Sequence, residues 1–240
     1  ALYTQKMQAL LNGWKKVFLN PDFKLYFAQL APFTYGGDKT RLPRIWEAQQ
    51  KFADNEKDAG MAVINDVGNL KDIHPSDKKT VGERLALLAL KRDYGKSDLK
   101  ADSPTLKSHR VENGKFILDF NDVEQWTTKN NKPAANFEIA AIDGVYYPAA
   151  VEIRGTSLVV GSDKVKAPKS LRYMWEQTDE ATLANEAGLP LGAFRIEPPV
   201  VLDELIAYFK GTSKLVYEYD LLSGSGFGDR TRVNYIADHS

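Results

Sequence analysis

The chain has 240 residues, 43% of them hydrophobic, and its 32 basic and 32 acidic residues balance to a formal net charge of zero. This length provides one domain core with room for a second domain. The even charge leaves no electrostatic footprint for a nucleic acid or an anionic membrane, so neither is expected as a partner. Because cysteine is absent, disulfides, thiolate catalysis and cysteine zinc sites are excluded.

The first part of the chain alternates between helical and strand patterns. Apolar residues between Met7 and Phe18 follow helical spacing, and a second helix is expected from Thr40, with Pro43 in its first turn. Residues 25–30 and 61–64 are short, nearly continuous apolar runs, typical of strands covered on both faces. The order predicts an α/β fold with right-handed crossovers onto a parallel sheet.

A third helix is expected over residues 77–94. Thr80 and Glu83 are spaced as a capping box at its start, and Gly95 provides a stop signal.

The predicted parallel sheet has only two strands. Sheets normally have about four to six strands, and a two-stranded parallel sheet buries too little surface to stand alone. We therefore expect residues 1–96 to be the C-terminal part of a larger α/β domain, completed by another chain or by a preceding stretch of the protein.

Residues 104–197 change to an antiparallel pattern. Asn113-Gly114 favours a type I′ hairpin turn, and Asp143-Gly144 marks a second hairpin. Short strands separated by Gly, Ser, Asp and Pro then predict a β-sandwich-like accessory module after a linker over 97–104. Residues 198–240 are predicted to hold a short helix plus strands, the start of a truncated β unit.

The candidate chemical site is Asp72-Ile73-His74-Pro75, which follows the second predicted strand. Loops at the carboxyl ends of strands are where open α/β sheets hold their chemistry. His74 is a candidate general base or a loop histidine at a helix start, and Asp72 is a candidate acceptor of the Nδ1 proton of His74. Asp66 is either a competing orienter or a structural residue.

Other candidates are weaker. Phe33 and Tyr35, on the loop after the first strand, are candidates for stacking on a sugar ring. A metal site at Asp72 and His74 lacks a third ligand, so neither a metal nor another cofactor is expected. His109 is expected on a strand surface, and His239 carries no signal. The glycine-rich run 223–228 is expected to be a hairpin loop, since it lacks the Lys-Ser/Thr ending of a phosphate loop.

Three segments in a specific order resemble the sialate O-acetylesterases, which are SGNH-type serine esterases. They are residues 25–33 (LYFAQLAPF), 42–49 (LPRIWEAQ) and 72–86 (DIHPSDKKTVGERLA). The resemblance continues through residues 171–175 (LRYMW), 185–190 (NEAGLP) and 194–195 (FR), and covers roughly residues 1–196.

This resemblance implies an α/β/α hydrolase core that removes O-acetyl groups from sialic acid or related sugars through an acetyl-serine intermediate. His74 corresponds to the family's catalytic histidine, and Asp72 to the acid of its Asp-x-His-Pro motif. The family's serine and oxyanion-hole residues lie upstream of every residue here. The expected partners are therefore an O-acetylated sugar and the N-terminal half of the same enzyme, and this chain alone is expected to be inactive.

Two alternatives remain open at this stage. In the first, the chain is a non-catalytic carbohydrate-binding or assembly module whose β-sandwich is the functional part. In the second, it is an esterase for other acetylated sugars such as acetylxylan. The sequence leaves localisation unknown, and a periplasmic or extracellular site is suggested by the resemblance alone.

Overall fold

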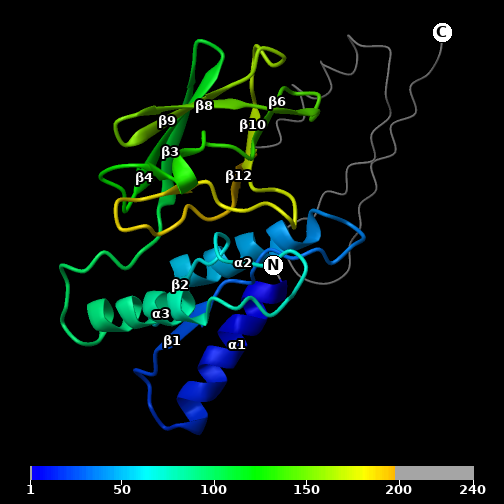
Figure 1. Ribbon diagram of the computed structural model, residues 1–240. Helices are drawn as coiled ribbons and strands as arrows, with labels where there is room; N and C mark the ends of the chain where they lie inside the picture. Colours follow the sequence, from blue (N-terminus) through cyan, green and yellow to red (C-terminus); the bar gives the residue numbers. More distant parts are fainter. Residues whose placement is uncertain (1, 198–240) are drawn as a thin grey trace. The chain divides into compact units, whose positions relative to one another are not determined.

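The computed structural model of the chain describes residues 2–197 (Figure 1). The first part has three helices, α1 (Leu2–Val17), α2 (Arg41–Asn55) and α3 (Lys78–Arg92). Between them lie two short parallel strands, β1 (Leu25–Ala28) and β2 (Ala59–Ala62), paired from Leu25 opposite Ala59 to Ala28 opposite Ala62. The predicted α/β order is confirmed.

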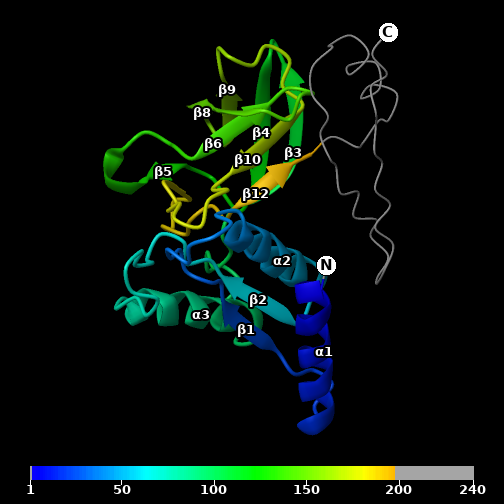
Figure 2. The same cartoon turned by 90° about the vertical axis from the view of Figure 1, so that its right-hand side faces the viewer.

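Helices cover both faces of the two-stranded sheet (Figure 2). Leu11 of α1 and Phe52 of α2 form one buried cluster with Leu25 and Ala59 on the first face. On the second face, Leu88 of α3 packs with buried residues of β2 and the segment after it. Because the strands are covered on both faces, their side chains are apolar throughout rather than alternating.

The rest of the described chain is antiparallel β structure. One sheet has the order β3-β4-β9-β8, another the order β12-β10-β6-β7, and β11 pairs with β5. The first sheet contains β3 (Thr105–Glu112), β4 (Lys115–Asn121), β8 (Ala150–Arg154) and β9 (Ser157–Gly161). The second contains β6 (Phe137–Ala140), β7 (Tyr146–Pro148), β10 (Ser170–Tyr173) and β12 (Phe194–Ile196). The short pair is β5 (Thr127–Thr128) and β11 (Leu183–Ala184), and a 3-10 turn, η1 (Lys129–Asn131), follows β5.

The two four-stranded sheets share one apolar core. Phe116 and Leu158 come from the first sheet, Phe137 and Leu171 from the second, and all four are almost completely buried in the same cluster. Trp46 of α2 belongs to this cluster too, so the helix nearest the sandwich packs into its core. The predicted β-sandwich-like module is confirmed.

Three local predictions need correction. The first strand is expected over 25–30, but β1 ends at Ala28. The second strand is expected over 61–64, but β2 is Ala59–Ala62, and Val63 and Ile64 are buried beyond its end. The capping box at Thr80 and Glu83 is wrong: the cap is Asp77, whose carboxylate accepts hydrogen bonds from the backbone N–H and the hydroxyl of Thr80. An acidic N-cap satisfies a free N–H at the helix start equally well.

The expectations for residues 198–240, including the glycine-rich run and His239, lie outside the described residues. Between residues 2 and 197, no helix combines the length and apolar character needed to cross a bilayer.

Candidate active site

Asp72 and His74 lie together on the loop that follows β2. The Oδ1 atom of Asp72 accepts a hydrogen bond from the backbone N–H of His74 at 2.9 Å. The Nδ1 atom of the imidazole lies 3.6 Å from the same oxygen. Asn69 shapes the preceding turn in the same way, since its Oδ1 atom accepts the backbone N–H of Lys71 at 2.9 Å. Such side-chain-to-backbone bonds are how Asn and Asp fix tight loops.

Both side chains of this pair face solvent. The side chain of His74 is 85% exposed and that of Asp72 is 60% exposed. The Nδ1–Oδ1 distance is longer than a hydrogen bond, so the acid and the imidazole are adjacent without being locked. Hydrogen bonds of active sites are often long in a free protein and tighten only when a complex forms.

The loop after β1, which carries Phe33 and Tyr35, lies beside this pair's loop. The backbone N–H of Thr34 donates to the carbonyl oxygen of Leu70 at 3.3 Å. Gly68 backs directly onto Pro32: a Cβ atom at Gly68 would lie 2.9 Å from the Pro32 ring, which only glycine avoids. The two sequence-predicted sets of site residues are therefore on neighbouring loops, as the parallel strand order requires.

The two aromatic rings of the first loop support each other. Phe33 and Tyr35 meet edge to face with ring centroids 4.9 Å apart. The side chain of Tyr35 is 48% exposed, so one ring of the pair is open to a ligand. An aromatic ring held by a second ring presents an apolar face at little cost in conformational entropy.

Asp66 does not pair with His74 but with Arg84. Its carboxylate makes two hydrogen bonds with the guanidinium of Arg84, at 2.6 and 2.7 Å. Arg84 is buried and also donates to the carbonyl oxygens of Val63, at 2.8 Å, and Gly188, at 3.3 Å. This arginine therefore ties α3 to the start of the loop that carries Asp72 and His74. The sequence reasoning missed it, although a charged residue on the apolar face of a helix was a visible signal.

The β module also holds both loops. Lys129 donates through Nζ to the carbonyl oxygen of Asp66 at 2.7 Å, and the backbone N–H of Ala181 donates to the carbonyl oxygen of Asn65 at 3.1 Å. The loop of Phe33 is fixed in the same manner, since its N–H donates to the carbonyl oxygen of Gln177 at 3.1 Å. Residues from the sandwich thus position the site from outside the parallel sheet.

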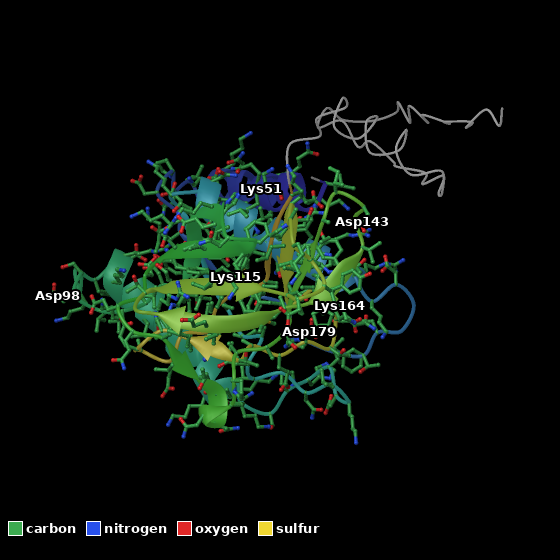
Figure 3. The ribbon with its side chains drawn as sticks, turned by 90° about the horizontal axis from the view of Figure 1, so that it is seen from above. Lys51, Asp98, Lys115, Asp143, Lys164 and Asp179 are labelled. Carbon is green, nitrogen blue, oxygen red and sulfur yellow. The ribbon has the colours of Figure 1, made fainter. Side chains whose placement is uncertain are left out.

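One acidic group of this supporting turn is electrostatically unusual. Burial raises the pKa of Asp179, labelled in Figure 3, to about 6, while its carboxylate accepts the backbone N–H of Glu176 at 3.0 Å. Glu176 and Glu138 add like-charge repulsion, and Arg172 opposes it. Partial burial therefore disfavours the charged form of this carboxylate.

A surface hollow of about 410 Å³ adjoins the loop that carries the candidate pair. It is lined by residues 66–70 and 75–77 together with Glu180. In the part of the chain that the structure describes, no group of three or more His, Asp or Glu side chains is arranged to hold a metal ion. His109 lies exposed on β3, with its ring 6.1 Å from Phe116, as a strand-surface residue would.

Taken together, the fold and the site define a parallel α/β unit with an acid–imidazole pair after its second strand. A β-sandwich is joined to this unit and makes hydrogen bonds to the loops after β1 and β2. No family model matches the chain, and no curated protein matches it. Among solved structures, a carbohydrate acetylesterase from Xanthomonas citri is similar, with 34% sequence identity, a TM-score of 0.76 and 81% of this chain covered. The chain spans 46% of that protein's length. The likeness supports a relationship to carbohydrate esterases.

Proposed function

We propose that this chain is a portion of a carbohydrate O-acetylesterase that supplies Asp72 and His74 to a serine nucleophile carried outside residues 2–197. The observation that carries the proposal is the adjacency of the two loops, with the imidazole on one and an open aromatic ring on the other. The similarity to a carbohydrate acetylesterase supports an acetylated carbohydrate as the substrate class.

In the proposed reaction His74 acts as the general base. Its Nε2 atom takes the proton of the serine hydroxyl as the serine oxygen bonds to the acetyl carbonyl carbon. When the tetrahedral intermediate collapses, the bond to the sugar oxygen breaks and that oxygen takes the proton from His74. In the second half of the reaction, water gives a proton to His74 as its oxygen bonds to the acetyl carbon. The bond between the acetyl carbon and the serine oxygen then breaks, acetate leaves, and His74 returns the proton to the serine oxygen.

Asp72 has the orienting role in this scheme. Its carboxylate accepts a hydrogen bond from the Nδ1–H group of His74, stays ionised, and stabilises the imidazolium that forms during each transfer. The 3.6 Å separation of the two groups supports this role, because a small movement of either side chain closes the hydrogen bond. The exposure of the pair fits a site that is completed by further polypeptide.

Phe33 and Tyr35 are proposed to bind the sugar by stacking. Their position beside the His74 loop supports this assignment, as does the exposure of Tyr35. We propose an O-acetylated sialic acid as substrate from the motif resemblance, with other acetylated sugars, such as acetylxylan, as the alternative within the same chemistry. In this proposal residues 1–96 carry the chemistry and 104–197 support it.

A purely carbohydrate-binding role for the β-sandwich is less well supported. Such a module needs exposed aromatic side chains on a strand face. Among residues 2–197, the large aromatic side chains with substantial exposure are Trp14, Phe18, Tyr35 and Tyr94, and none of them is on a sandwich strand.

The test is hydrolysis of an aryl acetate by the purified 240-residue chain, alone and co-expressed with the part of the Xanthomonas citri acetylesterase that this chain does not match. We expect no hydrolysis alone and measurable hydrolysis with the second polypeptide. A profile over acetylated sialic acids and acetylxylan then identifies the sugar. Robust hydrolysis by the chain alone, abolished by His74→Ala, would contradict the requirement for an external serine.

A further inference from the structure

Arg41, the first residue of α2, is the one arginine within residues 2–197 that has no ionic partner. This part of the chain contains eight arginines, and seven of them lie 2.6 to 3.9 Å from a carboxylate oxygen. The side chain of Arg41 is exposed, and its guanidinium makes neither a hydrogen bond nor an ion pair with the described residues. A guanidinium binds a carboxylate through two parallel N–H···O bonds, so Arg41 is free to receive one from a ligand.

The acid that precedes Arg41 by three positions, Asp38, is occupied by other donors. Its Oδ1 atom accepts the backbone N–H of Thr40 at 2.9 Å and the hydroxyl of the same residue at 2.8 Å, and Arg44 lies 3.9 Å from its Oδ2 atom. The hydrogen bonds from Thr40 are the main cause of the lowered pKa of Asp38, and Arg41 contributes least among the groups that lower it. Asp38 therefore does not neutralise Arg41.

The segment around Arg41 carries one uncompensated positive charge. Its cations are Lys39, Arg41 and Arg44, and the carboxylates in contact with them are Glu176, 3.4 Å from Lys39, and Asp38. Three positive charges against two negative ones leave a net charge of +1, which belongs to Arg41. An anionic ligand gains a charge-assisted hydrogen bond here, and a neutral ligand does not.

Arg41 follows directly on the loop that carries the aromatic pair. One residue, Gln177, binds both ends of that loop: its carbonyl oxygen accepts the N–H of Phe33 at 3.1 Å, and its own N–H donates to the carbonyl oxygen of Lys39 at 2.9 Å. Because both ends bond to a single residue, Phe33 and the start of α2 are held close together. The ring of Tyr35 packs edge to face on Phe33, so the open aromatic ring and the guanidinium belong to the same part of the surface.

The same edge of the sheet carries the proposed base. The carboxyl ends of β1 and β2 lie at one edge, because the strands are parallel. The loop after β1 leads from this edge to the start of α2, and it contacts the loop of His74 through the hydrogen bond between Thr34 and Leu70. A sugar ring stacked on Tyr35 therefore has both the His74 loop and the start of α2 as neighbours.

We propose that Arg41 binds the carboxylate of an O-acetylated sialic acid and selects this acidic sugar over neutral acetylated sugars. The inference rests on the proposed function and separates the two substrate classes named there, because a sialic acid carries a carboxylate and the acetylated xylose units of acetylxylan do not. The planar guanidinium fixes the carboxylate through two parallel bonds, so it orients the sugar as well as attracting it. The sugar ring then lies on Tyr35, with its acetyl ester toward His74.

The first measurement is a nuclear magnetic resonance titration of the full chain alone. Its probes are N-acetylneuraminic acid and the C1 amide of the same sugar, which differs only in lacking the negative charge. We expect both probes to shift the backbone signals of Tyr35 and Arg41, with a Kd about tenfold lower for the acid, the low end for a hydrogen bond to a charged group. Equal Kd values for the two probes, or no binding of either, overturn the proposal.

Arg41→Ala should abolish this preference for the acid. The variant retains the backbone N–H that donates to the carbonyl oxygen of Asp38 at 3.1 Å, so the start of α2 keeps its turn. The matched control is Arg110→Ala, which removes the same charge from an exposed site on β3 and should leave the preference unchanged. An equal loss of preference in both variants would mean that the overall charge of the chain attracts the acid, and it would contradict a site at Arg41.

The second measurement uses the complex with the non-matching part of the Xanthomonas citri acetylesterase. We expect Arg41→Ala to lower the ratio of kcat/KM for an O-acetylated sialic acid to kcat/KM for acetylxylan about tenfold, through KM for the acid. Arg110→Ala should leave this ratio unchanged. Hydrolysis of both substrates with an unchanged ratio in Arg41→Ala contradicts the carboxylate site without touching the proposed function.

His74→Ala separates the two claims in the other direction. It should remove hydrolysis by the complex and leave the binding of N-acetylneuraminic acid to the full chain intact. Binding that depends on Arg41, in a complex that hydrolyses no acetyl ester, would support the carboxylate site and contradict the proposed function.

Discussion

Arg84 and Asp66 form a bidentate ion pair, with Nη1–Oδ1 and Nη2–Oδ2 distances of 2.6 and 2.7 Å. The pair joins α3 to the segment that leads from β2 to the His74 loop. Only 8% of the arginine side chain and 19% of the aspartate side chain are exposed, so each charge depends on the other. Removing one partner from such a pair leaves an uncompensated, largely buried charge.

We therefore expect Arg84→Ala to lower the free energy of unfolding by about 3 kcal/mol. Urea denaturation at pH 7 measures the change. The matched control is Arg110→Ala, because Arg110 pairs with Glu112 and Asp119 at an exposed site, where solvent screens the pair and its loss has little effect on stability. Equal effects of the two substitutions would contradict the structural role of Arg84.

The prediction of the loops from the sequence succeeded where local chemistry decides the structure. The turn at Asn113-Gly114 has φ values of 50° and 72°, which few residue pairs other than Asn-Gly adopt without strain. Asp72 and His74 are two positions apart, so their proximity needs only a short loop after a strand.

The prediction failed where distant residues decide the structure. Arg84 reaches back 18 positions to Asp66, and Lys129 reaches 63 positions to the same loop. No local spacing encodes such contacts, because they depend on how helices and sheets pack. Strands β5 and β11 have two residues each, too few for an alternating pattern to be read.

Asp58 stabilises the folded protein at neutral pH, and this stabilisation is lost at low pH. Hydrogen bonds from Lys15 and Lys24 hold the pKa of its carboxyl at about 2, below the ordinary 3.8. The lowered pKa means that this contribution is complete above pH 3.8 and is lost as pH falls toward 2. We expect Asp58→Asn to cost about 1–2 kcal/mol at pH 7 and almost nothing near pH 2.

Denaturation curves at both pH values check this, with Asp163→Asn as an exposed control. A cost for Asp58→Asn that is the same at pH 7 and pH 2 would exclude the linkage.

Asp179 should have the opposite dependence. Burial raises the pKa of its carboxyl to about 6, so its ionisation opposes folding as pH rises from about 4 to above 6. Asp179→Asn keeps an oxygen that can accept the N–H of Glu176 and removes the charge. We expect it to stabilise the protein by about 1–2 kcal/mol at pH 8 and by nothing near pH 3.5. Melting temperatures of the Asp179→Asn variant and the original protein across this pH range test the prediction. A lower melting temperature of the variant at pH 8 would mean that the charge itself stabilises the fold.

Tyr35 should affect sugar binding rather than the acyl transfer. In the active complex, we expect Tyr35→Ala to raise KM for an acetylated sugar about tenfold, equal to about 1.4 kcal/mol. The kcat/KM for an aryl acetate, which has no sugar ring, should be nearly unchanged. Tyr94→Ala is the matched control, since Tyr94 is 71% exposed after α3. An equal loss of kcat/KM for both substrates would contradict a sugar-binding role for Tyr35.

In the proposed function, His74 is the general base of an ester hydrolase completed by another segment. The most direct measurement is kcat of the active complex for an aryl acetate, with His74→Ala compared to His109→Ala at an exposed strand position. We expect kcat to fall by at least about 10³-fold for His74→Ala and to be unchanged for His109→Ala. Full activity in His74→Ala, with the complex intact, would contradict the proposed function.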